Sequence, residues 1–262
     1  MKNLISCIVL LSCAQYAYAD MTLEFKELIS KGVITYNVKN EHLKFIQSEQ
    51  NRINLFNQKN LQFISFDPES GQSAMFNEKV LELRVNQLNK KRLDKLAKVE
   101  SNLGEKLQTM TPEEQEVGES LVNLLKYPEM YGEHTHLTVK KSDTLKQIQS
   151  ITCQVYQLYR AKQRIKDFCM ADAKALKMSA KDYQTFRSFY AFNYNMQTRL
   201  MIAMGNTRFN LVNYNQQKIP GIAIESINYN GAKVTQHLIL NLINSHTLPK
   251  TEFTLPKPAT TN

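Results

Sequence analysis

The period of the hydrophobic pattern changes along this chain, and this feature constrains the fold most. From Met21 to Phe76, apolar and polar residues alternate in short runs such as Val33-Ile-Thr-Tyr-Asn-Val38. From about Glu78 to Tyr127, apolar residues recur every three or four positions, and alternating runs return from His136 onward. Alternation is typical of strands with one buried face, whereas the longer spacing is typical of helices. The pattern predicts an α+β protein with a helical insert between two β regions.

The first β region consists of several short strands separated by turn signals such as Lys31-Gly32 and Asp67-Pro-Glu-Ser-Gly71. Strands at this spacing indicate an antiparallel meander. Because one face of each strand is apolar, we expect one side of the sheet to be covered.

The helical insert, at about 78–127, carries its own start and stop signals. Thr111 is a suitable N-cap, Pro112 follows at the first helical position, and two glutamates then favour the positive end of the helix. This second helix is expected to stop before Pro128. The insert is therefore predicted to be a helical hairpin.

Two cysteines, Cys153 and Cys169, remain outside the N-terminal segment, and each lies in a β-branched and aromatic run. A hairpin centred on Ala161 places the two cysteines directly opposite each other. Opposite Cβ atoms lie about 4.5–5.5 Å apart, close to disulfide reach. The resulting disulfide would contribute roughly 3 kcal/mol. Two reactive or metal-binding thiols remain the alternative, although the chain has no Cys-x-x-Cys motif.

A last helix is predicted to start after Ser179 and to end near Gly205, with an apolar side rich in tyrosine. The two runs that follow flank Asn230-Gly231, a strong signal for a β-hairpin. We expect a single α+β domain over 20–250 and a Pro- and Thr-rich C-terminal tail over 251–262.

The N-terminal residues 1–19 are interpreted as a signal peptide. Lys2 precedes an apolar run, and Ala17-Tyr18-Ala19 provides small residues for cleavage near Ala19. Two alternatives stay open: lipidation at Cys13, and a buried N-terminal helix. The apolar run is shorter than the roughly 20 residues that span a bilayer. We therefore expect a periplasmic protein without a transmembrane segment in the mature chain.

The chain carries a net charge of +9 at pH 7, and only one basic residue, Lys2, lies in the predicted signal peptide. The remaining positive charges are spread along the sequence rather than gathered in a block, so no nucleic-acid partner is predicted. A basic protein in this compartment would be attracted to anionic lipid headgroups or to an acidic partner.

Five short segments, in their order along the chain, carry a resemblance to known proteins. They are Met110-Thr-Pro-Glu-Glu-Gln115, Thr152-Cys-Gln-Val-Tyr156, Asp167-Phe-Cys-Met-Ala171, Gly221-Ile-Ala-Ile224 and Thr251-Glu-Phe-Thr-Leu-Pro256. The chain resembles a bacterial family of exported proteins of unknown function, which is distantly similar to periplasmic lipoprotein carrier and acceptor (LolA/LolB-like) proteins. The resemblance implies a curved antiparallel sheet, an unclosed barrel, with helices on its concave face. No ligand residue is carried over.

Aromatic residues recur in the predicted strands and have two interpretations. They either line an apolar cavity for an acyl chain or form the core between sheet and helix. The candidate cavity residues are Phe25, Tyr36, Phe45, Phe56, Phe63 and Tyr156.

Catalytic and metal-binding motifs are not evident in the sequence. His134 and His136 would share one face of a strand, but two ligands do not complete a zinc site. The chain has no Gly-x-Ser-x-Gly, no phosphate-binding glycine loop and no His-Glu-x-x-His. We predict no metal, no cofactor, no catalytic residue and no enzyme activity, with a hydrolase as a distant third possibility.

The sequence thus favours a non-enzymatic periplasmic protein that binds an apolar ligand, a lipid or a lipoprotein, in a half-barrel. The alternative is an accessory or scaffold factor that stabilises an envelope-spanning complex, such as a bacterial secretion system, through the helical insert.

Overall fold

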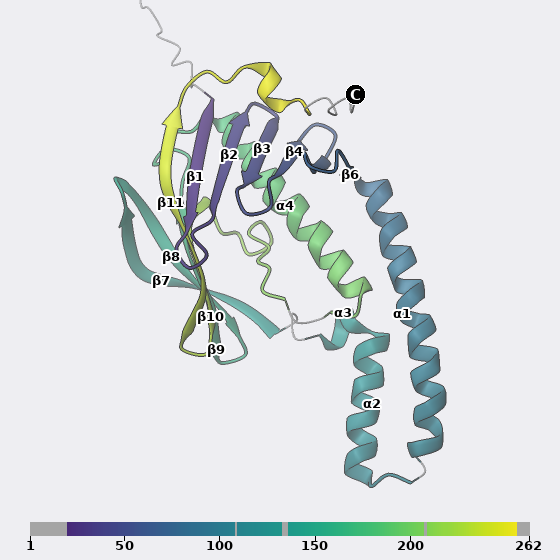
Figure 1. Ribbon diagram of the computed structural model, residues 1–262. Coiled ribbons are helices and arrows are strands. Elements are labelled where there is room, and N and C mark those ends of the chain that lie inside the picture. The colour runs from purple at the N-terminus through teal and green to yellow at the C-terminus, as the bar shows by residue number, and fades with distance from the viewer. Residues whose placement is uncertain (1–19, 108, 133–135, 207–208, 256–262) are drawn as a thin grey trace, which may run out of the picture.

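The computed structural model describes residues 20–107, 109–132, 136–206 and 209–255 (Figure 1). The strands of the first β region are β1 (Met21–Glu27), β2 (Val33–Lys39), β3 (His42–Gln47), β4 (Arg52–Asn57), β5 (Gln62–Phe66) and β6 (Ser73–Phe76). The later strands are β7 (Leu137–Ile148), β8 (Ile151–Arg160), β9 (Gln163–Ala171), β10 (Ile222–Asn230) and β11 (Lys233–Ser245). The helices are α1 (Glu78–Leu107), α2 (Pro112–Lys126), α3 (Pro128–Tyr131), α4 (Ala180–Ala203) and the 3-10 helix η2 (Lys250–Phe253).

Within the described chain, eleven strands form one antiparallel sheet in the order β6-β5-β4-β3-β2-β1-β11-β10-β9-β8-β7. The sheet consists of two meanders that meet where the first strand, β1, pairs with the last strand, β11. Strands β6 and β7 lie at opposite ends of the sheet and do not pair with each other, so the barrel is unclosed. This α+β architecture confirms the predicted fold class.

The helical insert connects these two distant ends of the sheet. Helix α1 has 30 residues and follows β6, and its length corresponds to about 45 Å. It packs along α4, and α2 packs back along α1. In Figure 1 the far end of the α1–α2 hairpin extends beyond the sheet, whereas α4 lies across one of its faces and contacts β2, β3 and β10.

The predicted N-caps are confirmed. The Thr111 hydroxyl accepts the N–H of Glu114, and the Glu114 carboxylate accepts the Thr111 N–H at 2.9 Å, which is a capping box. The Ser179 hydroxyl accepts the N–H of Asp182 at 3.0 Å. Helix α2 ends at Lys126, before Pro128, as the sequence predicts.

The first turn of α4 is anchored to the turn between β2 and β3. The buried carboxylate of Asp182 accepts the backbone N–H of Asn40 at 2.6 Å. The buried hydroxyl of Thr185 contacts the carbonyl oxygen of Asn40 and the side chain of Gln58. Burial raises the pKa of Asp182, and the hydrogen bonds of its carboxylate with Ser179 and Asn40 oppose the shift. These contacts fix the start of α4 against the turn between β2 and β3.

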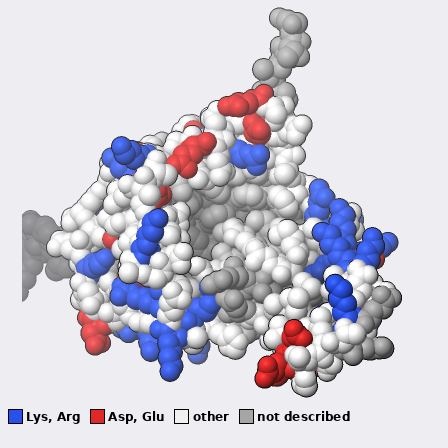
Figure 2. All heavy atoms as spheres, turned by 60° about the horizontal axis from the view of Figure 1, so that its bottom comes forward, with Lys and Arg blue, Asp and Glu red and all other residues white. Residues whose placement is uncertain are grey.

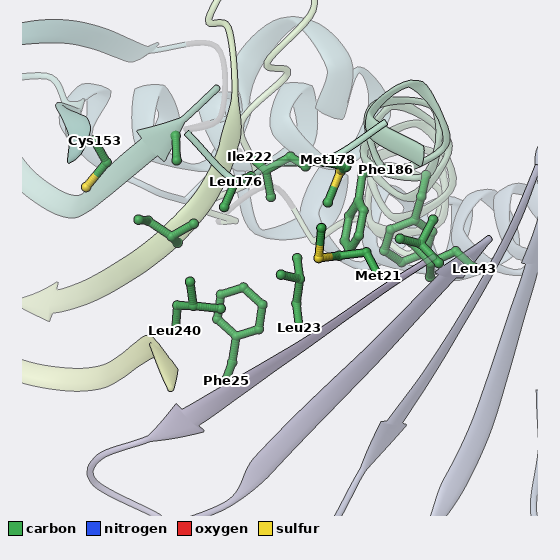
Figure 3. Close-up of a cluster of buried hydrophobic side chains, with 14 of the residues drawn as sticks. Met21, Leu23, Phe25, Leu43, Cys153, Leu176, Met178, Phe186, Ile222 and Leu240 are labelled. Carbon is green, nitrogen blue, oxygen red and sulfur yellow. The ribbon is translucent and has the colours of Figure 1, made fainter. Parts of the chain in front are cut away.

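Aromatic rings fill the space between α4 and the first meander. Phe186, Phe189 and Phe192 repeat at helical spacing and are buried. The ring of Phe189 lies 5.5 Å from that of Phe45 and 5.6 Å from that of Phe56, typical spacings for packed aromatic pairs. Figure 3 shows side chains from both halves of the sheet in this core, including Phe25 of β1 and Leu240 of β11.

The predicted disulfide is present, but its predicted register is wrong. Cys153 and Cys169 are bonded and buried, with Cα atoms 5.4 Å apart. Cys169 pairs in the β8–β9 ladder with Val155, so Cys153 lies diagonally across. A two-residue turn that begins at Ala161, with a bulge in the strands beside it, shifts the pairing from the symmetric hairpin that the sequence suggested.

The residues after β11 return to the first meander. The carboxylate of Glu252 in η2 contacts Lys44 at 2.8 Å and the side-chain amide of Asn37 at 2.9 Å. The first residues of the predicted tail therefore pack on the sheet. None of the helices in the described residues combines the length and the apolar character that crossing a membrane requires.

Candidate ligand cavity on the concave face

A cavity of about 190 Å³ lies where the two meanders meet, under α4 and the segment that leads from α4 to β10. Strands β1, β2, β9, β10 and β11 all contribute side chains to it. The lining residues are Phe25, Tyr36, Lys166, Tyr190, Tyr214, Ala223, Glu225, Ser226, Gln236 and Leu238.

Three tyrosines form part of the cavity wall, so the wall presents apolar rings that carry hydroxyl groups. The rings of Tyr190 and Tyr214 are 5.3 Å apart, and the ring of Tyr214 lies edge-on to Phe168 at 5.5 Å. Burial raises the pKa of Tyr36 and that of Tyr214 to about 12, and raises the pKa of Tyr190 well above its usual value. The phenols therefore stay neutral and can only donate or accept hydrogen bonds.

Lysine side chains are usually exposed to solvent, so Lys166 is unusual in a cavity wall of aromatic residues. It lies in β9, where it pairs with Leu158 of β8 and Asn228 of β10, and its side chain shares a face with the buried Phe168. Burial lowers the pKa of Lys166 to about 8, because desolvation disfavours the charged form. Among the residues that the structure describes, no carboxylate forms an ion pair with Lys166.

The other charged groups near the cavity leave this positive charge uncompensated. Glu225 contacts Lys146 at 2.7 Å and His237 at 3.0 Å, so its carboxylate is already shared by two partners. Arg187 of α4 donates to the carbonyl oxygen of Gly221 at 3.0 Å and to the side chain of Asn215. Its positive charge also reaches Tyr190 and Tyr214 and slightly opposes the rise in their pKa values.

The six aromatic residues singled out in the sequence fall into three groups. Phe25 and Tyr36 line the cavity. Phe45, Phe56 and Phe63 fill the core against α4. Tyr156 stacks on Phe168 at 5.7 Å in a second cluster that continues from the cavity along β8 and β9.

Sequence reasoning missed Lys166 and Tyr214 as cavity residues. Lys166 alternates with Phe168 in the run Ile165-Lys-Asp-Phe, so the strand pattern places a lysine on the apolar face. That mismatch was a usable signal. Tyr214 lies between α4 and β10 in a segment without regular structure, where no periodicity assigns a face.

The cavity suits binding better than metal chemistry. No three His, Cys, Asp or Glu side chains gather in the described residues. His136 is exposed, and Glu133 and His134 lie outside the described residues. An apolar cavity of about 150 Å³ can hold a benzene molecule, whereas drug-sized ligands need about 300 Å³ or more. The observed volume therefore fits one ring or a short acyl segment.

The projecting hairpin provides a second surface with apolar character. Helix α2 has no buried residue, and its Val117 and Leu121 are 70% and 51% exposed. Met130 and Tyr131 of α3 are 66% and 53% exposed. The Arg92 guanidinium of α1 holds the hairpin together by donating to the carbonyl oxygens of the last turn of α2.

Figure 2 views the molecule from the end at which the hairpin projects. Lys and Arg side chains gather in two groups on this face, with a hollow between them. Such an arrangement attracts anions over a distance set by the ionic strength.

No known family model and no curated protein sequence matches this chain. Two solved structures, both of PNGF-II, in space groups C2 and P21, superpose with a TM-score of 0.39 and share 5% and 4% identity. The matches cover 89% of this chain but only 29% and 30% of the PNGF-II chains. At this level of similarity the comparison supports no family or activity.

Proposed function

We propose that this protein is a non-enzymatic periplasmic carrier that binds an apolar ligand, a lipid or the acyl part of a lipoprotein, in its half-barrel. The observation that supports this most is the cavity where the two meanders meet, because it lies on the face of the sheet that α4 covers and is lined by aromatic side chains. The resemblance to lipoprotein carriers points the same way. The cavity would take the end of an acyl chain rather than a whole lipid.

The test uses two eight-carbon probes, 1-octanol and octanoate, titrated into the purified mature chain and followed by calorimetry or ligand-observed NMR. At least one probe should bind saturably at one site. Ala223→Leu, which places a larger side chain in the cavity wall, should abolish that binding.

The control is Ala74→Leu, the same substitution at an exposed position of β6, and this variant should bind like the parent. If neither probe binds the parent, or if Ala223→Leu binds as well as the parent, the cavity does not hold the ligand.

The projecting hairpin favours a second candidate function, that of an accessory factor docking on an envelope-spanning complex. Exposed Val117 and Leu121 on α2 form an apolar patch on an element that does little for the core. Exposed apolar groups that are surrounded by polar residues often mark protein interaction sites.

Because the insert joins opposite ends of the sheet, its removal would disturb the whole fold, so point changes are the better test. Val117→Glu with Leu121→Glu should abolish crosslinks to membrane-complex subunits in cells that express the protein natively. Val234→Glu, at a partly exposed position of β11, is the control and should keep them. Unchanged crosslinks in the α2 double variant would exclude docking through this patch.

A further inference from the structure

We propose that Lys166 selects a ligand with a singly charged anionic head group, a carboxylate, attached to a short apolar segment. This inference rests on the proposed function, because it names the class of ligand that the cavity takes.

The charge balance of the cavity supports an anion. Lys166 is a lining residue, and Arg187 lies close enough to influence the tyrosines of the same wall. The carboxylate in the described lining, that of Glu225, is already contacted by Lys146 and His237. An anion that enters the cavity therefore meets unneutralised positive charge and no free carboxylate in the described wall.

Packing and stability alone do not account for a lysine at position 166. Lys166 is half-buried, with Leu158 as its cross-strand neighbour and Phe168 two positions along the same face, so its ammonium loses hydration that no ion pair within the described residues restores. A methionine or leucine would fill the same space at lower free energy. A strongly perturbed titratable group in a cavity is a typical feature of functional sites. With a pKa near 8 the side chain is still mostly protonated at neutral pH, so it can contact an anion.

Lys166 is the one cationic side chain in the described lining and the tyrosines are neutral, so the cavity favours a ligand with one negative charge. Tyr190 and Tyr214 can each donate a hydrogen bond to an anionic oxygen, but they cannot compensate a second negative charge. The hydrocarbon part would then lie against Phe25 and Leu238. Phe25 belongs to β1 and Leu238 to β11, so this part of the ligand bridges the two meanders.

The experiment compares octanoate with 1-octanol, which has the same chain but no charge, in three proteins at pH 7. In the parent, octanoate should bind about tenfold to a hundredfold more tightly than 1-octanol, the usual gain from a hydrogen bond to a charged group. Lys166→Met should abolish this preference while leaving 1-octanol binding intact. Lys162→Met removes a lysine from the exposed turn of the same hairpin and should keep the preference.

The outcomes separate this inference from the proposed function. Equal binding of both probes to the parent, or a preference that survives in Lys166→Met, overturns the role of Lys166 and leaves the cavity function standing. Binding of neither probe overturns both. Lys166→Gln serves as a second neutral variant, so that a folding defect in one variant does not decide the result.

Discussion

Among single residues, Lys166 gives the cavity its charge, because it interrupts the apolar face of β9. Along β9, positions that face the covered side of the sheet are apolar except at Lys166. Charged side chains that are buried without a partner cost stability. Residues that cost stability at a cavity often contribute to binding instead.

The cost of Lys166 predicts a pH-dependent effect on stability. The pKa of Lys166 is about 8 in the folded protein and near 10.5 in the unfolded chain. Between these two pH values the unfolded state holds the proton more tightly, so the free energy of unfolding rises with pH. Below about pH 8 the full cost, on the order of 3 kcal/mol, is present. Lys166→Met should therefore raise the free energy of unfolding at pH 7, and this advantage should shrink toward pH 10.

Urea unfolding of the parent and of Lys166→Met at several pH values measures this difference. Other titratable groups contribute equally to both proteins, so their contribution cancels in the difference between the two free energies of unfolding. A stability difference that stays constant from pH 7 to pH 10 would contradict the assigned burial of Lys166.

Among the helices and strands, N-cap residues and periodicity predict the helices well, whereas the pairing of strands distant in sequence cannot be predicted from local sequence. Thr111 and Ser179 mark helix starts because the cap uses residues within three positions. The β1–β11 pairing joins Met21 to Ser245, and nothing near either residue encodes it. The position of Cys169 shows the same limit, since a local bulge decided the register. The cavity lies at this junction, which local sequence does not encode, so of its wall the sequence pattern indicates Phe25 and Tyr36 alone.

The anchoring of α4 provides a test at this scale. Asp182→Ala removes the acceptor of the Asn40 N–H and should lower the free energy of unfolding by about 1–3 kcal/mol. Asp182→Asn keeps an acceptor oxygen and avoids the burial of a charge, so its stability should stay close to that of the parent. Thermal unfolding of the two variants checks this, and equal losses in both would show that the hydrogen bond to Asn40 does not hold the helix.

At the scale of the whole molecule, the structure consists of a continuous sheet with its covering helix and a helical hairpin that projects from it. The hairpin contacts the rest mainly through α1, which packs against α4 and the end of β6. No residue of α2 is fully buried, although Val122 and Leu125 are half-buried. Its stability therefore depends on its caps and on α1 rather than on the core.

Hydrogen exchange should reveal this division. Amides of α2 should exchange through local opening, at a free energy well below that of global unfolding, whereas amides of β1 and β11 should exchange only with global unfolding. Mass spectrometry on peptides from these elements measures both. Protection of α2 equal to that of β1 would mean that the hairpin is not an independent unit, and protection that appears only in cell extract would indicate a bound partner.

The central position of the β1–β11 pair also affects the order of assembly. Among the described strands, β1 is synthesised first and β11, its partner on one side, is synthesised last. Until then the first meander has a bare edge, which is a ready site for non-native pairing with another chain. Contacts between the two ends of a chain slow folding, because the loop entropy must be lost before the contacts form. The sheet of the described chain, and the cavity at its centre, can thus form only after β11 has been made.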